Sequence, residues 1–93
     1  MVTIQDDHVW SGGEKIGYLE GARFFDMDGT EMGYYENDAI YNAGGRKIGY
    51  LENDYIYNID GSVYDRIERN HEAVNGGSYS NLCCAAVSLL FGN

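Results

Sequence analysis

The chain has 93 residues with 15 acidic and 6 basic side chains, and its net charge of −9 argues against binding to nucleic acids or to anionic membranes. Ninety-three residues suffice for one domain with one modest core. Thirteen glycines and no proline favour a fold with many tight turns, because glycine adopts positive φ freely and no proline interrupts a β-ladder.

Residues 1–7 are polar and acidic, and they contain neither the basic start nor the apolar stretch of a signal peptide. The two cysteines, Cys83 and Cys84, are adjacent, so a disulfide between them would close a strained ring and stabilise little. Both features predict a protein located in the reducing cytoplasm.

A 16-residue unit recurs along most of the chain. Four glycines mark it at a constant spacing, and each unit holds a strand-like stretch of the type Ile-Gly-Tyr-Leu-Glu and a second one of the type Ile-Tyr-Asn. Units this short cannot each bury a core, so they must pack side by side and share one. The marking glycines are Gly13, Gly29, Gly45 and Gly61, and the triads that follow the first three are Ile16-Gly17-Tyr18, Met32-Gly33-Tyr34 and Ile48-Gly49-Tyr50.

The repeat predicts four β-hairpins, at residues 8–20, 23–36, 39–52 and 55–68. Their tips are predicted to be two-residue type I′ turns, in which both residues have positive φ. Further turn-forming pairs connect one hairpin to the next. The tips are Gly12-Gly13, Asp28-Gly29, Gly44-Gly45 and Asp60-Gly61, and the connecting pairs are Gly21-Ala22, Asn37-Asp38 and Asn53-Asp54.

The strands carry apolar side chains on both faces, since Ile16 and Tyr18 alternate with Gly17 and Leu19. This pattern favours a compact, strongly curved sheet. The glycine that recurs inside the first strand of each unit predicts a close approach of another backbone or an aromatic ring at that position.

The chain changes character after the repeats. Residues 1–69 are predicted to form the hairpin domain, residues 70–79 a linker, and residues 80–92 an apolar helix within the same domain. Ser80 is a suitable N-cap and Gly92 a suitable residue after the helix end. Because this helix is apolar nearly all round, we expect it to be buried, either across the open face of the hairpins or against another copy of the protein.

The hairpin units, with Ile-Gly-Tyr-Leu-Glu, Ile-Tyr-Asn and Asp-Gly in the same phase, resemble the bacterial four-fold β-flower domains over about residues 8–91. The Ala-Ala-Val-Ser-Leu-Leu-Phe ending is similar to the tail of that family. The resemblance implies a mostly β fold with four hairpins in a pseudo-four-fold, flower-like arrangement, and it implies no activity. The sequence departs from the pattern at Asp65, which stands where glycine is expected, and in its first tip, which is one residue shorter.

The sequence offers no constellation of an acid, a base and a nucleophile, so we expect no enzyme activity. His8 and His71 lack the spacing of metal ligands. The Asp-Gly pairs resemble fragments of calcium loops but recur with the repeat, which favours a role in turns. No cofactor and no metal are therefore predicted.

Aromatic residues recur in columns at the repeat spacing. Tyrosine is favoured at interfaces, and aromatic rows on repeated hairpins also bind sugars or cationic head groups. The same columns can instead hold the sheet together as cross-strand pairs. The candidate ligand or partner surface is Trp10, Tyr18, Phe25, Tyr34, Tyr41, Tyr50 and Tyr57.

Two functions fit these observations. The first is a non-catalytic structural or protein-interaction module that self-associates or binds another protein. The second is a ligand-binding module that uses the aromatic columns. For the first, the candidate oligomer contact is the apolar set on the tail helix, Leu82, Val87, Leu89, Leu90 and Phe91.

Overall fold

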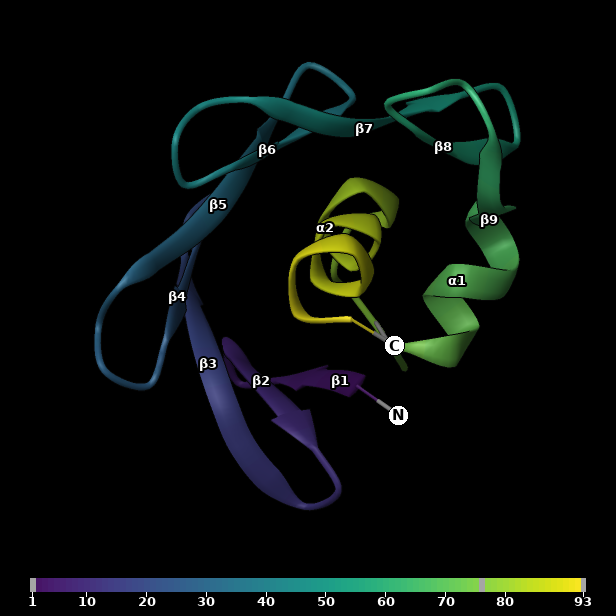
Figure 1. The fold of residues 1–93 in the computed structure, drawn as a ribbon. Coiled ribbons are helices and arrows are strands. Elements are labelled where there is room, and N and C mark those ends of the chain that lie inside the picture. The colour runs from purple at the N-terminus through teal and green to yellow at the C-terminus, as the bar shows by residue number, and fades with distance from the viewer. Residues whose placement is uncertain (1, 76, 93) are drawn as a thin grey trace.

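The computed structural model describes residues 2–75 and 77–92, and within them one antiparallel sheet curls around a C-terminal helix (Figure 1). The strands pair in chain order, from β1 at one edge to β9 at the other. The strands are β1 (Val2–Gln5), β2 (His8–Ser11), β3 (Glu14–Glu20), β4 (Arg23–Asp26), β5 (Glu31–Glu36), β6 (Ala39–Asn42), β7 (Lys47–Glu52), β8 (Tyr55–Asn58) and β9 (Val63–Arg66), and the helices are α1 (Ile67–Ala73) and α2 (Asn81–Phe91).

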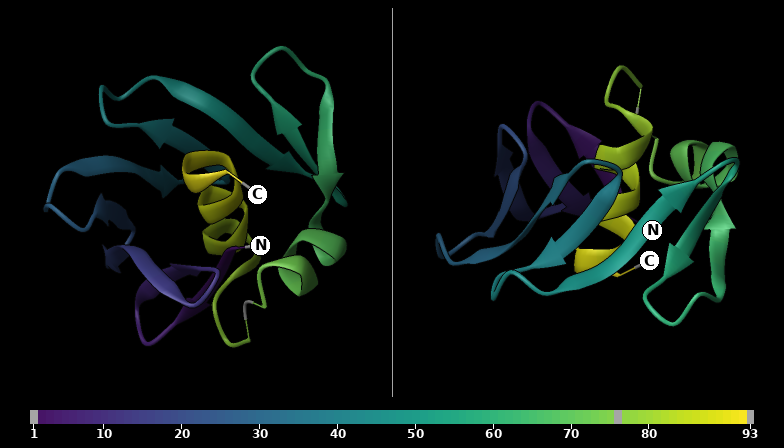
Figure 2. Two further views of the ribbon diagram at one scale, coloured as in Figure 1. Left: turned by 60° about the horizontal axis from the view of Figure 1, so that its bottom comes forward. Right: turned by 90° about the horizontal axis from the view of Figure 1, so that it is seen from above.

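This architecture confirms the prediction of a mostly β fold with a short C-terminal helix. The strands pair within the four ranges that the repeat predicted as hairpins, as β2–β3, β4–β5, β6–β7 and β8–β9. The sheet is open, and α1 lies beside α2 in the gap between β9 and β1 (Figures 1 and 2). Three sides of α2 are therefore covered by sheet and the fourth by a helix.

The prediction of type I′ turns holds only for the first tip, where Gly12 and Gly13 both have positive φ. At the β4–β5 tip only Gly29 does, with φ of 87°. There the Asp26 carboxylate accepts hydrogen bonds from the backbone N–H groups of Asp28 and Thr30, at 2.9 and 3.0 Å. The longer loop with one left-handed glycine replaces a two-residue turn because this side chain binds the loop's backbone.

Two elements were missing from the sequence expectation. Strand β1 pairs with β2 and buries Val2 and Ile4 in the core. Helix α1 occupies Ile67–Ala73, so it covers the end of the predicted hairpin domain and the start of the predicted linker at 70–79. The chain turns into this helix directly after β9, at the repeat in which Asp65 stands in place of glycine.

The core lies between the inner face of the sheet and α2. Phe24, Ile40 and Ile56 occupy equivalent positions in three successive hairpins, and all three are fully buried. On α2, the six residues from Cys83 to Ser88 are buried without interruption, as expected for a helix surrounded by protein. Ser80 caps the helix, since its side chain accepts a hydrogen bond from the Cys83 N–H at 3.0 Å.

The recurring glycines contact successive residues of α2. A β-carbon at Gly17 would lie 2.6 Å from Phe91 Cε1, and one at Gly33 would lie 2.7 Å from Leu90 Cδ2. One at Gly49 would lie 2.7 Å from Leu89 Cδ1. The next residue toward the start of α2 is Ser88, and it contacts α1, where its hydroxyl donates to Asn70 Oδ1 at 2.6 Å.

This order follows from helix geometry. Successive residues of an α-helix point about 100° apart and rise about 1.5 Å, which is close to the quarter turn that separates the sides of a four-sided ring. Four consecutive residues of α2 each contact a different element, which are β3, β5, β7 and α1 in chain order. Because each contact is displaced along the helix axis from the last, the surrounding elements form a spiral, which fits an open sheet.

Candidate functional site

The aromatic columns form three stacked pairs on the face of the strands opposite to the glycines. Tyr18 stacks on Phe25 with ring centroids 5.2 Å apart, and Tyr34 stacks on Tyr41 at 4.9 Å. The third pair, Tyr50 and Tyr57, repeats this geometry at 5.2 Å. The three pairs join neighbouring strands β3–β4, β5–β6 and β7–β8, so each ring already uses one face to hold the sheet together.

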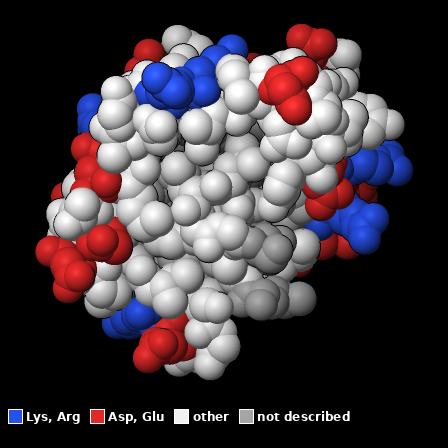
Figure 3. Space-filling model, in the orientation of Figure 1, with Lys and Arg blue, Asp and Glu red and all other residues white. Residues whose placement is uncertain are grey.

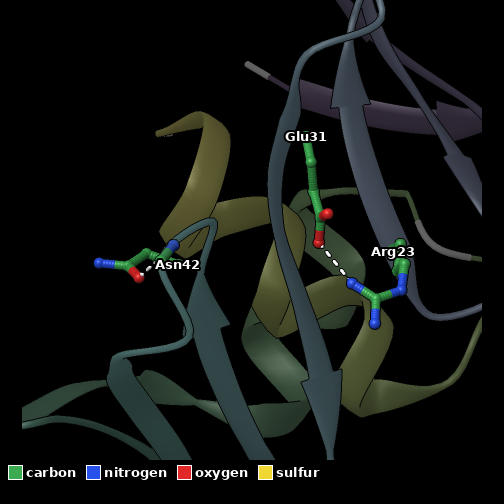
Figure 4. A network of polar contacts seen from close by, with 4 residues as sticks. Arg23, Glu31 and Asn42 are labelled. Atoms are coloured by element: carbon green, nitrogen blue, oxygen red, sulfur yellow. Dashed lines mark hydrogen bonds and ion pairs between the residues drawn. The ribbon is translucent and has the colours of Figure 1, made fainter.

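Basic side chains cover several of the remaining ring faces. Arg23 lies 5.1 Å from the centre of the Tyr34 ring, and Lys47 lies 4.9 Å from that of Tyr50. Arg23 of β4 also reaches across its hairpin to Glu31 of β5 at 2.7 Å (Figure 4). The chain thus places its own basic side chains over these rings. A cationic ligand would have to displace those side chains to reach the ring faces.

Trp10, the predicted residue of the degenerate first copy, follows the same pattern. Its ring lies 5.4 Å from Lys15 Nζ, and its indole N–H points to the Gln5 carbonyl at 3.4 Å. The structure therefore distributes the seven predicted aromatic residues along the outer face of successive strands. Their use by a sugar or a cationic ligand stays a prediction.

The last hairpin, β8–β9, differs from the others on this outer face. Its first strand begins with Tyr55 where β4 has Arg23, and its second strand begins with Val63 where β5 has Glu31. Tyr55, Ile59 and Val63 are 38%, 57% and 53% exposed. The Tyr55 ring lies 6.3 Å from that of Tyr57, and Tyr57 pairs with Val63 in the strand register. The hairpin therefore exposes an apolar surface where the β4–β5 hairpin carries an ion pair.

We call Tyr55, Ile59 and Val63 the β8–β9 patch. The patch was not predicted from the sequence. The prediction used the residues that the repeats share, whereas the patch consists of residues at which the last repeat differs from the others. Aligning the repeats reveals the patch. The second strands of the β4–β5, β6–β7 and β8–β9 hairpins begin with Glu31, Lys47 and Val63, so only the last of them begins with an apolar residue.

The tail-helix residues predicted as an oligomer contact pack mainly inside the chain. Val87 is fully buried, and Leu82, Leu89, Leu90 and Phe91 are half-buried against the core. The last turn of α2 comes toward the viewer in Figure 1, and the middle of the same face lacks charged side chains in Figure 3. Contact of the half-buried residues with another chain stays a prediction.

A polar hollow lies at the other end of α2. This cavity of about 690 Å³ is bounded by the β7–β8 turn, by α1 and by the start of α2. Its charged side chains are Asp54, Arg66, Glu68 and Glu72, together with the imidazole of His71. Among residues 2–75 and 77–92, no group of three or more His, Cys, Asp or Glu side chains has the geometry to hold a metal ion.

The two cysteines lie on the buried part of α2. Burial raises the pKa of the Cys83 thiol to about 12, helped by the neighbouring Cys84, and burial raises the pKa of Cys84 to about 11. The thiolate is the reactive form, so neither side chain is suited to act as a nucleophile near neutral pH.

We expect native protein at about pH 8 to resist alkylation by iodoacetamide, since on the order of one thiol in a thousand or fewer is ionised. Both cysteines should react once urea unfolds the chain. Because the unfolded thiols ionise first, the free energy of unfolding should also fall above about pH 9. Mass spectrometry of the labelled protein checks this, and rapid labelling of the folded chain would contradict the buried placement.

In the described part of the chain, no helix is both long and apolar enough to span a membrane. The model of the family described as 4-fold beta flower protein matches residues 10–80 of the chain. No curated protein and no solved structure matches the chain. The matched segment runs from β2 through α1 to the N-cap of α2, and it includes all three stacked aromatic pairs. On this evidence the chain belongs to the 4-fold beta flower family.

Proposed function

We propose that the protein is a non-catalytic interaction module that self-associates through the β8–β9 patch. The observation that carries the proposal is the exposure of three large apolar side chains on one hairpin, at positions where another hairpin carries charge or a smaller residue. Exposed apolar surface of this kind is typical of protein contacts. A second copy is the simplest partner, because a two-fold axis lets the same patch serve both chains.

The expected association is weak. A two-fold contact would bury the exposed parts of these three side chains on both copies, which contributes about 4–9 kcal/mol, and association costs of about 4–15 kcal/mol oppose it. The net charge of −9 on each copy adds a repulsion that salt screens. We therefore expect a reversible dimer that forms only at about millimolar concentrations and strengthens as the salt concentration rises.

The repeat itself supplies substitutions that the fold tolerates. Replacing Ile59 with alanine and Val63 with lysine introduces the residues that the β6–β7 hairpin carries at these positions, Ala43 and Lys47. Sedimentation velocity over a concentration series should show the mass of the wild type rising with concentration. The double variant should stay monomeric with an unchanged thermal melt.

The matched control is Met27→Ala, which makes the same kind of change at the tip of the β4–β5 hairpin, where Met27 is 51% exposed. This variant should associate like the wild type. A wild type that stays monomeric throughout, or a double variant that associates as well as the control, would contradict the proposal.

A further inference from the structure

Strand β9 is the last strand of the sheet, and one of its backbone groups lies where the other hairpins bond to the next strand. The Ile67 N–H donates to the Asp54 carbonyl at 2.9 Å, on the β8 side of the chain. Successive N–H groups of an extended chain point to opposite sides, so the N–H of Arg66 points to the outer edge of β9. At the equivalent position of β5, Tyr34 pairs with Tyr41 of the next strand. Arg66 therefore occupies the position at which a further strand would bond.

The side chain of Asp65 already binds this edge. Its Oδ1 accepts a hydrogen bond from the Arg66 N–H at 2.7 Å. Arg66 is also the N-cap residue of α1, and the carbonyl of an N-cap residue accepts the first hydrogen bond of its helix. Both backbone groups that Arg66 would offer to a further strand are thus used inside the chain.

Asp65 is the residue that stands where the other repeats have glycine. In the strand register it takes the position that Gly33 has in β5. Glycine is needed in β3, β5 and β7 because side chains of α2 come close to those strands. The next residue of α2 in this series, Ser88, contacts Asn70 of α1. A side chain therefore fits at position 65, and its carboxylate is free to bind the edge.

The same carboxylate opposes pairing with a second copy of the chain. Two copies that joined by this edge along a two-fold axis would bring two antiparallel β9 strands together. Because β9 has only four residues, the two Asp65 carboxylates would lie within about 10 Å of each other, where salt screens their repulsion only in part. Like charges that face each other across a strand pair destabilise the pairing.

We propose that Asp65 closes the outer edge of β9, so that the sheet ends there and a second copy does not add to it edge to edge. Free strand edges are templates for pairing with other chains, and charged side chains are one means of blocking them. At the opposite edge, Val2 and Ile4 of β1 are each 4% exposed, so the fold itself covers that strand. The inference concerns the edge of the last hairpin and does not depend on association through the β8–β9 patch.

Asp65→Ala tests the proposal, because alanine keeps the β-carbon and removes both the acceptor and the charge. In sedimentation velocity over a concentration series, this variant should form dimers at concentrations about tenfold or more below those at which the wild type forms them. Asp28→Ala removes the same charge from an exposed hairpin tip and should behave like the wild type. All three proteins carry the same patch, so the wild type reports on the patch and the difference between Asp65→Ala and the wild type reports on the edge.

Hydrogen exchange of the Arg66 amide gives a direct readout, measured in solutions dilute enough for every variant to be monomeric. Asp65→Asn keeps an oxygen acceptor, so its Arg66 N–H should exchange about as slowly as that of the wild type. In Asp65→Ala the same N–H should exchange about tenfold faster or more. Equal exchange in Asp65→Ala and the wild type, or an Asp65→Ala protein that sediments like Asp28→Ala at every concentration, would overturn the proposal.

Discussion

Replacing Gly33 with alanine is expected to destabilise the protein by about 3 kcal/mol or more, because overpacking a rigid site costs about 1–3 kcal/mol and this site has two obstacles. The new β-carbon would overlap the backbone carbonyl oxygen of Tyr41 and lie 2.7 Å from Leu90. The Leu90 side chain can move, but the carbonyl belongs to the neighbouring strand. Strand β5 would have to separate from β6 or from α2, which a urea denaturation midpoint would report.

Gly44→Ala is the matched control. Gly44 lies in the β6–β7 tip, and the nearest atom to an added β-carbon there is Asn42 Oδ1 at 3.5 Å, an ordinary van der Waals contact. This variant should keep the stability of the wild type to within about 0.5 kcal/mol, as surface substitutions usually do. If Gly33→Ala were equally harmless, the close approach of β5 to α2 would be wrong.

A chain that ends at Gly77 is expected to lose cooperative folding altogether. Such a chain lacks α2 and exposes the inner faces of Phe24, Ile40 and Ile56, which are fully buried in the whole protein. These three residues alone lose about 4–9 kcal/mol of burial energy, which compares with a total stability of about 5–15 kcal/mol for a small domain. Thermal melts followed by circular dichroism should show no sharp transition.

A chain that ends at Gly92 serves as the control, because it keeps all of α2 and the hydrogen bond from the Gly92 N–H to the Ser88 carbonyl at 3.1 Å. It should melt like the full chain. A shorter chain ending at Gly77 that retains the cooperative melt would show that the hairpins form a core without the helix.

The repeat made the hairpins predictable, because turn-forming pairs and apolar stretches recur at one spacing. The predicted ranges 23–36 and 39–52 begin and end at the same residues as the β4–β5 and β6–β7 hairpins. The C-terminal helix was equally predictable from the sequence. Ser80 and Gly92 are residues with a strong preference for helix ends, and α2 occupies the interval between them.

The parts that escaped prediction are those where the repeat breaks. Strand β1 holds Val2 and Ile4 at positions where β3 has Gly17 and Leu19, so it lacks the glycine that identified the other copies. Helix α1 has no apolar stripe of the usual width; it buries Asn70 and pairs it with Ser88. A polar contact between two helices depends on their relative position, which a single sequence does not show.

The candidate surfaces were predictable in residue type, but for the aromatic columns the sequence left open whether they pair across strands or bind a ligand. Tyr18, Tyr34 and Tyr50 were identified as a column, yet only the register shows that each stacks on an aromatic residue of the next strand. The same limit applies to Leu89, Leu90 and Phe91. Their apolar character indicated burial, whereas the glycines they contact follow from the spiral path of the strands around α2.

The position of α2 inside the curled sheet can be tested directly by nuclear Overhauser effects in the folded protein. The α-protons of Gly17, Gly33 and Gly49 should show cross-peaks to the side chains of Phe91, Leu90 and Leu89 respectively, one helix residue for each successive hairpin. Assigned spectra with these three pairings in this order would establish the arrangement. Cross-peaks from the glycines to other helix residues, or none to the helix, would contradict it.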